Sequence, residues 1–230
     1  MSRLPHALRP RHGRNGYLLL LVLGLILATS VIGVHDLTSL VGLFGLYVAL
    51  ATFGVTGAPL RLRVLGYAAG SVTVVAGVAA DVSHSDDLRG VAGIAAAAFT
   101  LMLIVAMLRD LARVTEVTLA TASGLVVVYL LIGLMFGQAA AGIHAVDPSA
   151  FRADFGPLDG FDFIYYSYVT LATLGYGDIT PAIGLTQALA VMEGVGGQLF
   201  LVTVVARVVS TMSAPRRRRP GGPGEEPPGE

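Results

Sequence analysis

The sequence predicts an all-α membrane protein in which six helices cross the bilayer and one shorter apolar helix enters it without crossing. Of the 230 residues, 54% are hydrophobic and only 13% are charged, and the mean hydropathy is +0.74. A soluble domain of this size does not bury so much apolar surface. Six apolar runs approach or exceed about 20 residues, the length that a helix needs to cross hydrocarbon, and the backbone there must be helical because lipid offers it no hydrogen-bond partners.

The first half of the chain predicts a polar tail followed by four spans. Residues 1–16 are polar and basic and are expected to form a cytoplasmic N-terminal tail. The next region, 17–116, holds four apolar runs, at about 17–34, 37–57, 64–80 and 91–108. A polar loop is expected at 81–89, and a short charged linker begins at Arg109 and Asp110. The first run also fits a secretory signal peptide, but it is long for one and further spans follow.

The second half, 117–212, has a different pattern. Two apolar runs, at about 117–138 and 182–212, enclose a polar loop, 139–160, and the segment 161–172. This segment is too short to span the membrane, so it predicts a re-entrant helix, with Asp159 or Asp162 as its N-cap. The last residues, 213–230, contain four consecutive arginines followed by Pro, Gly and Glu, a composition typical of a disordered tail. The arginines fit either contact with anionic lipid or a simple stop-transfer anchor.

A glycine-containing motif lies between the short helix and the last apolar run. It reads Thr170-Leu171-Ala172-Thr173-Leu174-Gly175-Tyr176-Gly177-Asp178. Glycine adopts positive φ without steric cost, so a backbone of alternating hand can turn successive carbonyls to one side. The carbonyls of residues 173–176 and the Thr173 hydroxyl would then line a narrow axis with the oxygen ligands that hard cations prefer. One strip cannot surround an ion, so several copies must meet around a symmetry axis.

The motif resembles the selectivity filter and pore helix of the potassium channel superfamily. The matching residues are Thr170, Thr173, Gly175, Tyr176, Gly177 and Asp178. Leu174 departs from the family, where valine is commoner, but this position contributes a carbonyl, so only the packing behind the filter changes. The alternative interpretation is an ordinary turn, which the two flanking apolar runs disfavour.

The resemblance covers about residues 117–212 and implies a pore domain of outer helix, pore helix, filter and inner helix. It implies a homotetramer that conducts K⁺ passively through four TLGYG loops, with K⁺ held at Thr173, Leu174, Gly175 and Tyr176 and the filter continuing to Gly177. It also implies that Thr170 and Asp178 support the filter, and that Tyr165 and Tyr166 form an aromatic cuff around it. For the two tyrosines, a pair at the membrane interface is the alternative.

Six spans with a pore between the last two are typical of voltage-gated channels, whose fourth span carries arginines at regular spacing. Here the fourth span has no arginine before Arg109 at its end. The region 17–116 therefore occupies the place of a voltage sensor without its gating charges, and we expect weak or no voltage dependence.

The last span contains the other polar and flexible positions of interest. Glu193 is a carboxylate inside the membrane, where acids are costly and point to function; it is expected either to hydrogen-bond behind the filter or to tune the cavity. Gly197 fits a hinge or a position of tight packing. Leu201, Val205 and Val209 recur at a four-residue step and predict an apolar inner constriction that gates by dewetting.

The positive charges predict the orientation. All 15 basic residues are arginine, and most lie in segments expected on the cytoplasmic side, whereas Arg89 and Arg152 lie outside. Both termini are therefore expected in the cytoplasm of a multi-pass protein of the plasma membrane, and the composition is typical of a high-GC bacterium. Asp178 is then external, where a carboxylate attracts cations.

Other functional classes find little support. The chain has no cysteine, its histidines lack metal-ligand spacing, and no catalytic constellation is present, so we expect neither an enzyme nor a cofactor beyond the permeant K⁺. Membrane lipid is an expected partner and nucleic acid is not. His35, His84 and His144 are expected in solvated outer loops. A potassium transporter subunit and a non-conducting membrane scaffold are the alternative functions.

Overall fold

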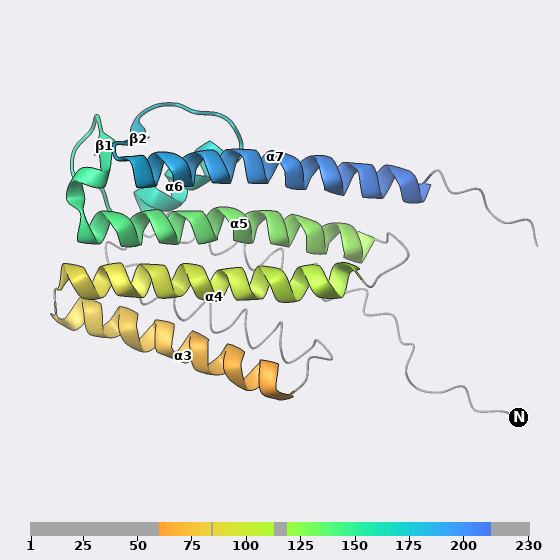
Figure 1. Cartoon of the computed structure of the whole chain (residues 1–230), viewed down its shortest axis with the longest axis horizontal. Helices are drawn as coiled ribbons and strands as arrows, with labels where there is room; N and C mark the ends of the chain where they lie inside the picture. The colour runs from red at the N-terminus through yellow and green to blue at the C-terminus, as the bar shows by residue number, and fades with distance from the viewer. Residues whose placement is uncertain (1–59, 84, 113–118, 213–230) are drawn as a thin grey trace, which may run out of the picture.

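The computed structural model of the chain describes residues 60–83, 85–112 and 119–212 (Figure 1). The elements in these ranges are α3 (Leu60–Ser83), α4 (Asp86–Ala112), α5 (Leu119–Val146), η1 (Pro148–Ala150), β1 (Phe151–Ala153), α6 (Gly160–Leu171), β2 (Ile179–Pro181) and α7 (Gly184–Met212). The predicted tails, 1–16 and 213–230, and the first two predicted spans, 17–34 and 37–57, lie outside the described residues.

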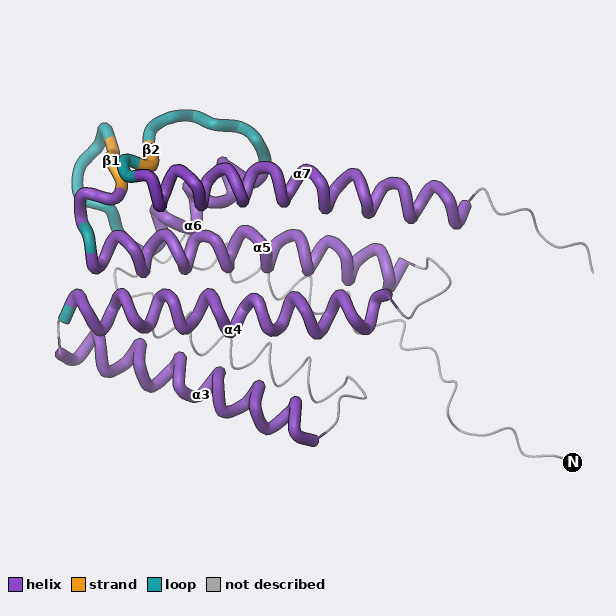
Figure 2. The backbone as a smooth tube through the Cα atoms, in the orientation of Figure 1, coloured by secondary structure: helices purple, strands orange, loops and turns teal. Residues whose placement is uncertain are grey.

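The long helices α3, α4, α5 and α7 lie side by side along the long axis of the molecule (Figures 1 and 2). Neighbours in this layer pack against each other in the order α3–α4–α5–α7. The short helix α6 packs on α5 and α7, and the strands β1 and β2 lie at the same end of the layer as the start of α7. The short helix and the two strands are therefore supported by the long helices.

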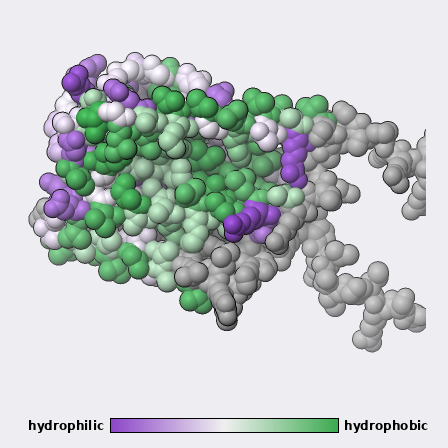
Figure 3. All heavy atoms as spheres, in the orientation of Figure 1, coloured by the Kyte–Doolittle hydropathy of each residue, from purple (hydrophilic) through white to green (hydrophobic). Residues whose placement is uncertain are grey.

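Three of the described helices are long and apolar enough to cross a membrane. They correspond to α4, the segment Thr121–Val146 of α5 and the segment Gly184–Arg207 of α7, while α3 contributes the shorter apolar stretch Ala68–Ala80. On the face drawn in Figure 3, apolar residues cover the middle and hydrophilic residues gather towards the two ends, as expected where the middle faces hydrocarbon. The prediction of a helical fold is confirmed, and the three apolar helices support a membrane protein. The count of six spans and the tetramer stay predictions.

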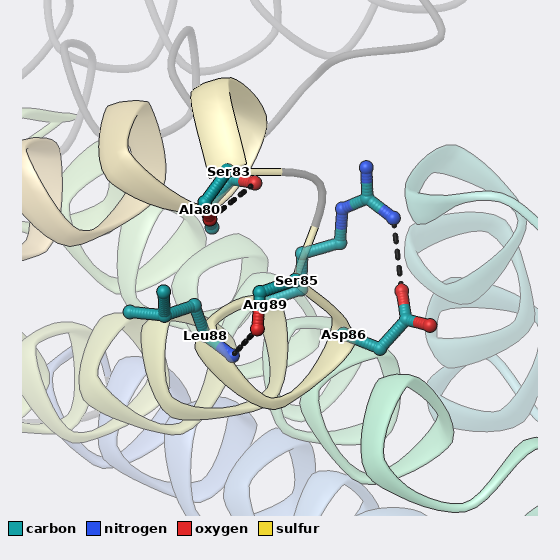
Figure 4. A network of polar contacts seen from close by, with 6 residues as sticks. All are labelled: Ala80, Ser83, Ser85, Asp86, Leu88 and Arg89. Carbon is teal, nitrogen blue, oxygen red and sulfur yellow. Dashed lines mark hydrogen bonds and ion pairs between the residues drawn. The ribbon is translucent and has the colours of Figure 1, made fainter.

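The loop predicted at 81–89 is shorter than expected because α4 already begins at Asp86. Ser85 precedes this first turn, and its side-chain oxygen accepts a bond from the backbone N–H of Leu88 at 3.4 Å (Figure 4). Asp86 and Asp87 lie in the first turn, where negative charge is favourable beside the helix dipole, and Asp86 pairs with Arg89 at 3.0 Å. Of the charges assigned to the loop, Asp86, Asp87 and Arg89 thus belong to the start of α4, whereas Asp81 belongs to the end of α3. At the other end α4 continues to Ala112 and includes Arg109 and Asp110.

Helix α5 also extends further than predicted, to Val146 instead of residue 138. Its 28 residues give a length of about 42 Å at 1.5 Å per residue, more than the hydrocarbon thickness on which the prediction relied. The added segment contains three consecutive alanines, which are strong helix formers, and it packs against α4. His144 therefore belongs to a helix and not to a solvated loop.

Glycine residues allow the backbones of α4 and α5 to come into direct contact. A Cβ atom added to Gly93 would lie 2.7 Å from the Cα of Gly142, and one added to Gly90 would lie 3.1 Å from the Gly142 carbonyl oxygen. Farther along the same contact, the buried Thr100 hydroxyl donates to Gln138 Oε1 at 2.8 Å. Small residues and buried hydrogen bonds are the usual basis of helix association in membranes. The two helices are therefore closely packed against each other.

Candidate functional site

Helix α6 begins with a capping box. Asp159 is the N-cap, and its Oδ1 accepts from the backbone N–H groups of Phe161 and Asp162 at 2.8 and 3.1 Å. In return, Asp162 Oδ2 accepts from the Asp159 N–H at 2.8 Å. The two aspartates that were alternative N-caps in the sequence therefore act together, since each satisfies a backbone donor that a helix start leaves free.

Helix α6 docks onto α5 through two glycines that are four residues apart. A Cβ on Gly137 would lie 3.0 Å from the Cα of Ile164, and a Cβ on Gly133 would lie 2.5 Å from the Tyr168 ring. The Tyr168 hydroxyl reaches past this contact and donates to the Leu130 carbonyl at 2.7 Å. Sequence reasoning did not single out these glycines, although a G-x-x-x-G pattern in an apolar helix is a known signal for close packing.

The strip that follows α6 has the alternating backbone that the motif predicts. Thr173, Gly175 and Gly177 have φ of +58°, +59° and +80°, and Thr173 is the only non-glycine residue with positive φ in the described ranges. Leu174 and Tyr176, between them, do not have positive φ. Residues 172–177 are exposed. The Val169 carbonyl accepts from the N–H groups of Leu174 and Gly175 at 2.9 and 3.4 Å, which ties the strip to the end of α6.

The supporting residue Thr170 also acts at this junction through its backbone. Its carbonyl accepts from the Thr173 N–H at 3.0 Å. One residue later, the Leu171 carbonyl accepts from the Tyr129 hydroxyl of α5 at 3.2 Å. The carbonyls at the end of α6, which an isolated helix leaves without partners, are thus used to hold the strip and the outer helix.

Asp178 anchors the far end of the strip. Its Oδ2 accepts from the Tyr165 hydroxyl of α6 at 2.7 Å, and its backbone carbonyl accepts from the Asp154 N–H at 3.2 Å. The bond to the carboxylate is the main cause that raises the pKa of Tyr165 to about 12, so this hydroxyl keeps its proton at physiological pH. The Tyr165 ring also stacks on Tyr176, with 6.4 Å between ring centroids.

A two-stranded sheet, which the sequence did not predict, closes the outer end. Strands β1 and β2 pair antiparallel, with Phe151 opposite Pro181 and Ala153 opposite Ile179. Just beyond β2, the Ala182 N–H donates to the Ala150 carbonyl at 2.9 Å, and the Thr186 hydroxyl donates to the same carbonyl at 2.9 Å. The loop expected at 139–160 is therefore largely ordered and clamps the segment that leaves the strip.

Tyr166 follows the strip-contacting Tyr165 in α6 but has different neighbours. Its ring is buried and packs edge-on against Phe151, with centroids 5.3 Å apart. Phe163 and His144 belong to the same aromatic group, with centroids 5.0 Å apart. Of the two tyrosines, Tyr165 contacts the strip and Tyr166 packs on the outer sheet. The aromatic cuff around a filter stays a prediction. The expectation of a solvated His144 is wrong, because the end of α5 carries it into this cluster.

Glu193 is buried, with 1% of its surface exposed. It forms a hydrogen bond with Ser167 of α6, and the Ser167 hydroxyl also contacts the Gly133 carbonyl of α5 at 2.6 Å. Of the two roles expected for Glu193, the structure supports the hydrogen bond behind the strip. Ser167 was missed because a single serine in an apolar helix carries no signal until its neighbours are known.

The remaining inner-helix positions differ in their surroundings. A Cβ on Gly197 would lie 2.5 Å from Leu171 Cδ1, which favours the tight-packing interpretation of this glycine over a hinge. Leu201 is half-buried, whereas Val205 and Val209 are exposed in the single chain. Their role as a constriction stays a prediction.

Residues 125–214 match the family model described as Ion channel. The match begins in α5 and includes α6, the strip 173–177 and α7. It supports the ion channel superfamily for this region. It also points to a channel and not an enzyme, and it agrees with the membrane location that the apolar helices indicate. Comparisons with curated proteins and with solved structures gave no match.

Proposed function

We propose that this protein is a potassium-selective channel in which four copies place residues 173–177 around a common axis. The observation that carries the proposal is the alternation of positive φ at Thr173, Gly175 and Gly177 in an exposed strip. A backbone in which residues with positive and negative φ alternate turns successive carbonyl oxygens to one side. Potassium channels replace the hydration shell of K⁺ with four such sets of carbonyls.

The surroundings of the strip favour the same function. Its inner end is tied to the α6 C-terminus by the Val169 carbonyl, and its outer end is tied to Tyr165 by Asp178. A strip held at both ends keeps its oxygens in place without an ion, and such preorganisation reduces the conformational cost of binding. The partial negative charge of the α6 C-terminus also favours a cation nearby.

The exposed surfaces favour assembly of several copies. In the most apolar window of α7 only 11% of the residues are buried within the chain, and large side chains such as Met192, Leu199 and Val202 are about two-thirds exposed. A homotetramer would cover part of this helix with neighbouring copies and close the strip into a ring. A strip on one chain leaves an ion open to water on the remaining sides.

We further propose that voltage does not gate this channel strongly. Helix α4 carries arginine only near its two ends, Arg89 in the first turn and Arg109 in the last. Its backbone is also in direct contact with that of α5 at Gly93 and Gly142. A sensor needs charges in the field and freedom to move. We also propose that the protein lies in the plasma membrane of a bacterium. Because most arginines are in segments assigned to the cytoplasmic side, both termini are in the cytoplasm and Asp178 is outside.

The test is current through purified protein in planar bilayers under a K⁺/Na⁺ gradient at both voltage polarities. Gly175→Ala is the test variant and Gly184→Ala is its control. A Cβ meets nothing within 4 Å at either position, but only Gly175 has positive φ, +59°. We expect a reversal potential near the K⁺ value that is lost in Gly175→Ala and kept in Gly184→Ala, with open probability nearly independent of voltage.

Other outcomes identify the alternatives. A reversal potential near zero in the unmodified protein would contradict K⁺ selectivity, and Leu174→Val would then test the filter packing. Absence of current together with K⁺ uptake into vesicles would favour a transporter subunit. Absence of both would favour a membrane scaffold and would overturn the proposal of a channel.

A further inference from the structure

Three oxygen atoms from three helices meet behind the filter strip. Ser167 Oγ, in the middle of α6, contacts both the Gly133 carbonyl oxygen of α5, at 2.6 Å, and Glu193 Oε1 of α7. The side chains of Ser167 and Glu193 are almost completely buried, with 0% and 1% of their surface exposed. Water therefore does not supply the hydrogens of these contacts from outside.

The number of hydrogen atoms limits the charge of Glu193. A serine hydroxyl carries one hydrogen, a carbonyl carries none, and an ionised carboxylate carries none. Two short contacts among these three oxygens need two hydrogens if each contact is a full hydrogen bond. The second hydrogen can come only from Glu193 in its protonated form, which donates to Ser167 while Ser167 donates to Gly133.

The neighbours of Glu193 agree with a neutral side chain. Among the residues that the structure describes, no basic side chain makes an ion pair with it. The titratable groups close enough to interact electrostatically are the hydroxyls of Tyr129 on α5 and of Tyr166 and Tyr168 on α6. A buried carboxylate without a cationic partner has a large desolvation penalty, which protonation removes.

We infer that Glu193 is a neutral carboxylic acid that positions the pore helix, by donating to Ser167 in a relay that ends on Gly133. The relay joins α7, α6 and α5 immediately behind the strip, because Val169, two residues after Ser167, accepts from Leu174 and Gly175. Movement of α7 would therefore act on the filter through this bond. Only this effect on conduction rests on the proposed function; the protonated state does not.

The protonation state is tested by infrared spectroscopy of the protein in lipid bilayers, labelled with ¹³C-carboxyl glutamate. We expect the difference between unmodified protein and Glu193→Gln at neutral pH to contain the carbonyl stretch of a protonated carboxylic acid. The tyrosines contribute equally to both spectra and cancel. A difference that contains only carboxylate bands would overturn the inference, because Ser167 would then donate to both acceptors from a single hydrogen.

The positioning role is tested by four variants in the bilayer experiment. Glu193→Gln keeps a neutral donor and should keep the reversal potential of the unmodified protein. Glu193→Ala and Ser167→Ala each break the relay and should shift the reversal potential towards zero. Thr203→Ala is the control, because its hydroxyl bonds within α7, to the Leu199 carbonyl at 2.7 Å.

The outcomes separate this inference from the proposed function. If Glu193→Gln loses selectivity as Glu193→Ala does, the side chain acts through its charge and the inference is wrong. If Ser167→Ala behaves as Thr203→Ala does, the relay has no positioning role. If the unmodified protein carries no current at all, the channel proposal fails, while the infrared spectrum still decides whether Glu193 holds a proton.

Discussion

Helices α5 and α7 have nearly the same length, 28 and 29 residues, but opposite relations to the rest of the chain. Half of the most apolar window of α5 is buried inside the chain, against 11% for α7. Helix α5 packs against α4, α6 and α7. Its glycines let the backbones of α4 and α6 come close to its own. Helix α7 contacts its own chain along one edge, which includes Glu193 and Gly197.

Hydropathy identifies a membrane span but does not indicate what covers it. Lipid is as apolar as leucine, so burial in a membrane protein depends on shape and on polar contacts. Helix α5 is the support on which one chain folds. Helix α7 presents an apolar face that remains for lipid or for further copies.

The largest predicted effect compares one leucine from each helix. Leu131 of α5 is 1% exposed and Leu199 of α7 is 64% exposed. Leu131→Ala should lower the free energy of unfolding by about 2–5 kcal/mol, whereas Leu199→Ala should change it by less than about 0.5 kcal/mol in dilute detergent. Reversible denaturation of the purified protein measures both. A destabilisation by Leu199→Ala that grows with protein concentration would show that a second copy covers α7.

A second prediction concerns the contact between α5 and α6. Gly137→Val places side-chain atoms where the Ile164 backbone lies 3.0 Å from an added Cβ, so it should destabilise the fold by about 1–3 kcal/mol or more. The same denaturation assay measures it. Gly184→Val is the control, since a Cβ there meets nothing within 4 Å. Equal effects of the two variants would contradict a docking role for Gly137.

A third prediction concerns the start of the pore helix. Asp159→Ala removes the acceptor of two backbone N–H groups and should cost about 1 kcal/mol of stability. Asp159→Asn keeps a side-chain oxygen and should restore most of it. Asp154→Ala serves as the control, because Asp154 contacts Asp178 through its backbone N–H. If Asp154→Ala is as damaging as Asp159→Ala, general charge at the outer surface is responsible and not the cap.

The smallest effect is expected for Tyr165→Phe, which removes the bond to Asp178 and leaves the stack on Tyr176. Selective current should decay faster in this variant, since the outer end of the strip loses one anchor. The pKa of Tyr165 is raised to about 12 from about 10, so the stabilisation is present below about pH 10 and is lost as pH rises through about 12.

The decay rates of the two proteins should therefore keep a constant ratio between about pH 6 and 9. Recordings at a series of external pH values measure this ratio. A ratio that changes within that range would show that a group other than the Tyr165 hydroxyl controls the bond.

Features that depend on neighbouring residues could be predicted from the amino-acid sequence. Apolar length predicted the helices α4, α5 and α7, the aspartates at 159 and 162 predicted the start of α6, and the glycines at 175 and 177 predicted a strip of alternating hand. These features follow from local rules of backbone conformation and helix capping, so each can be predicted from a short stretch of sequence. The residues that bind the ion, and the number of copies, stay predictions.

Only the tertiary structure decided which distant residues meet. The relay from Glu193 through Ser167 to Gly133, the pairing of β1 with β2, and the extension of α5 to Val146 all depend on the register between segments far apart in the chain. A serine, a glycine or a histidine has the same local pattern whether it faces lipid or a buried acid. Its partners depend on how the helices pack, and packing in a membrane follows shape and hydrogen bonding, which a hydropathy pattern does not contain.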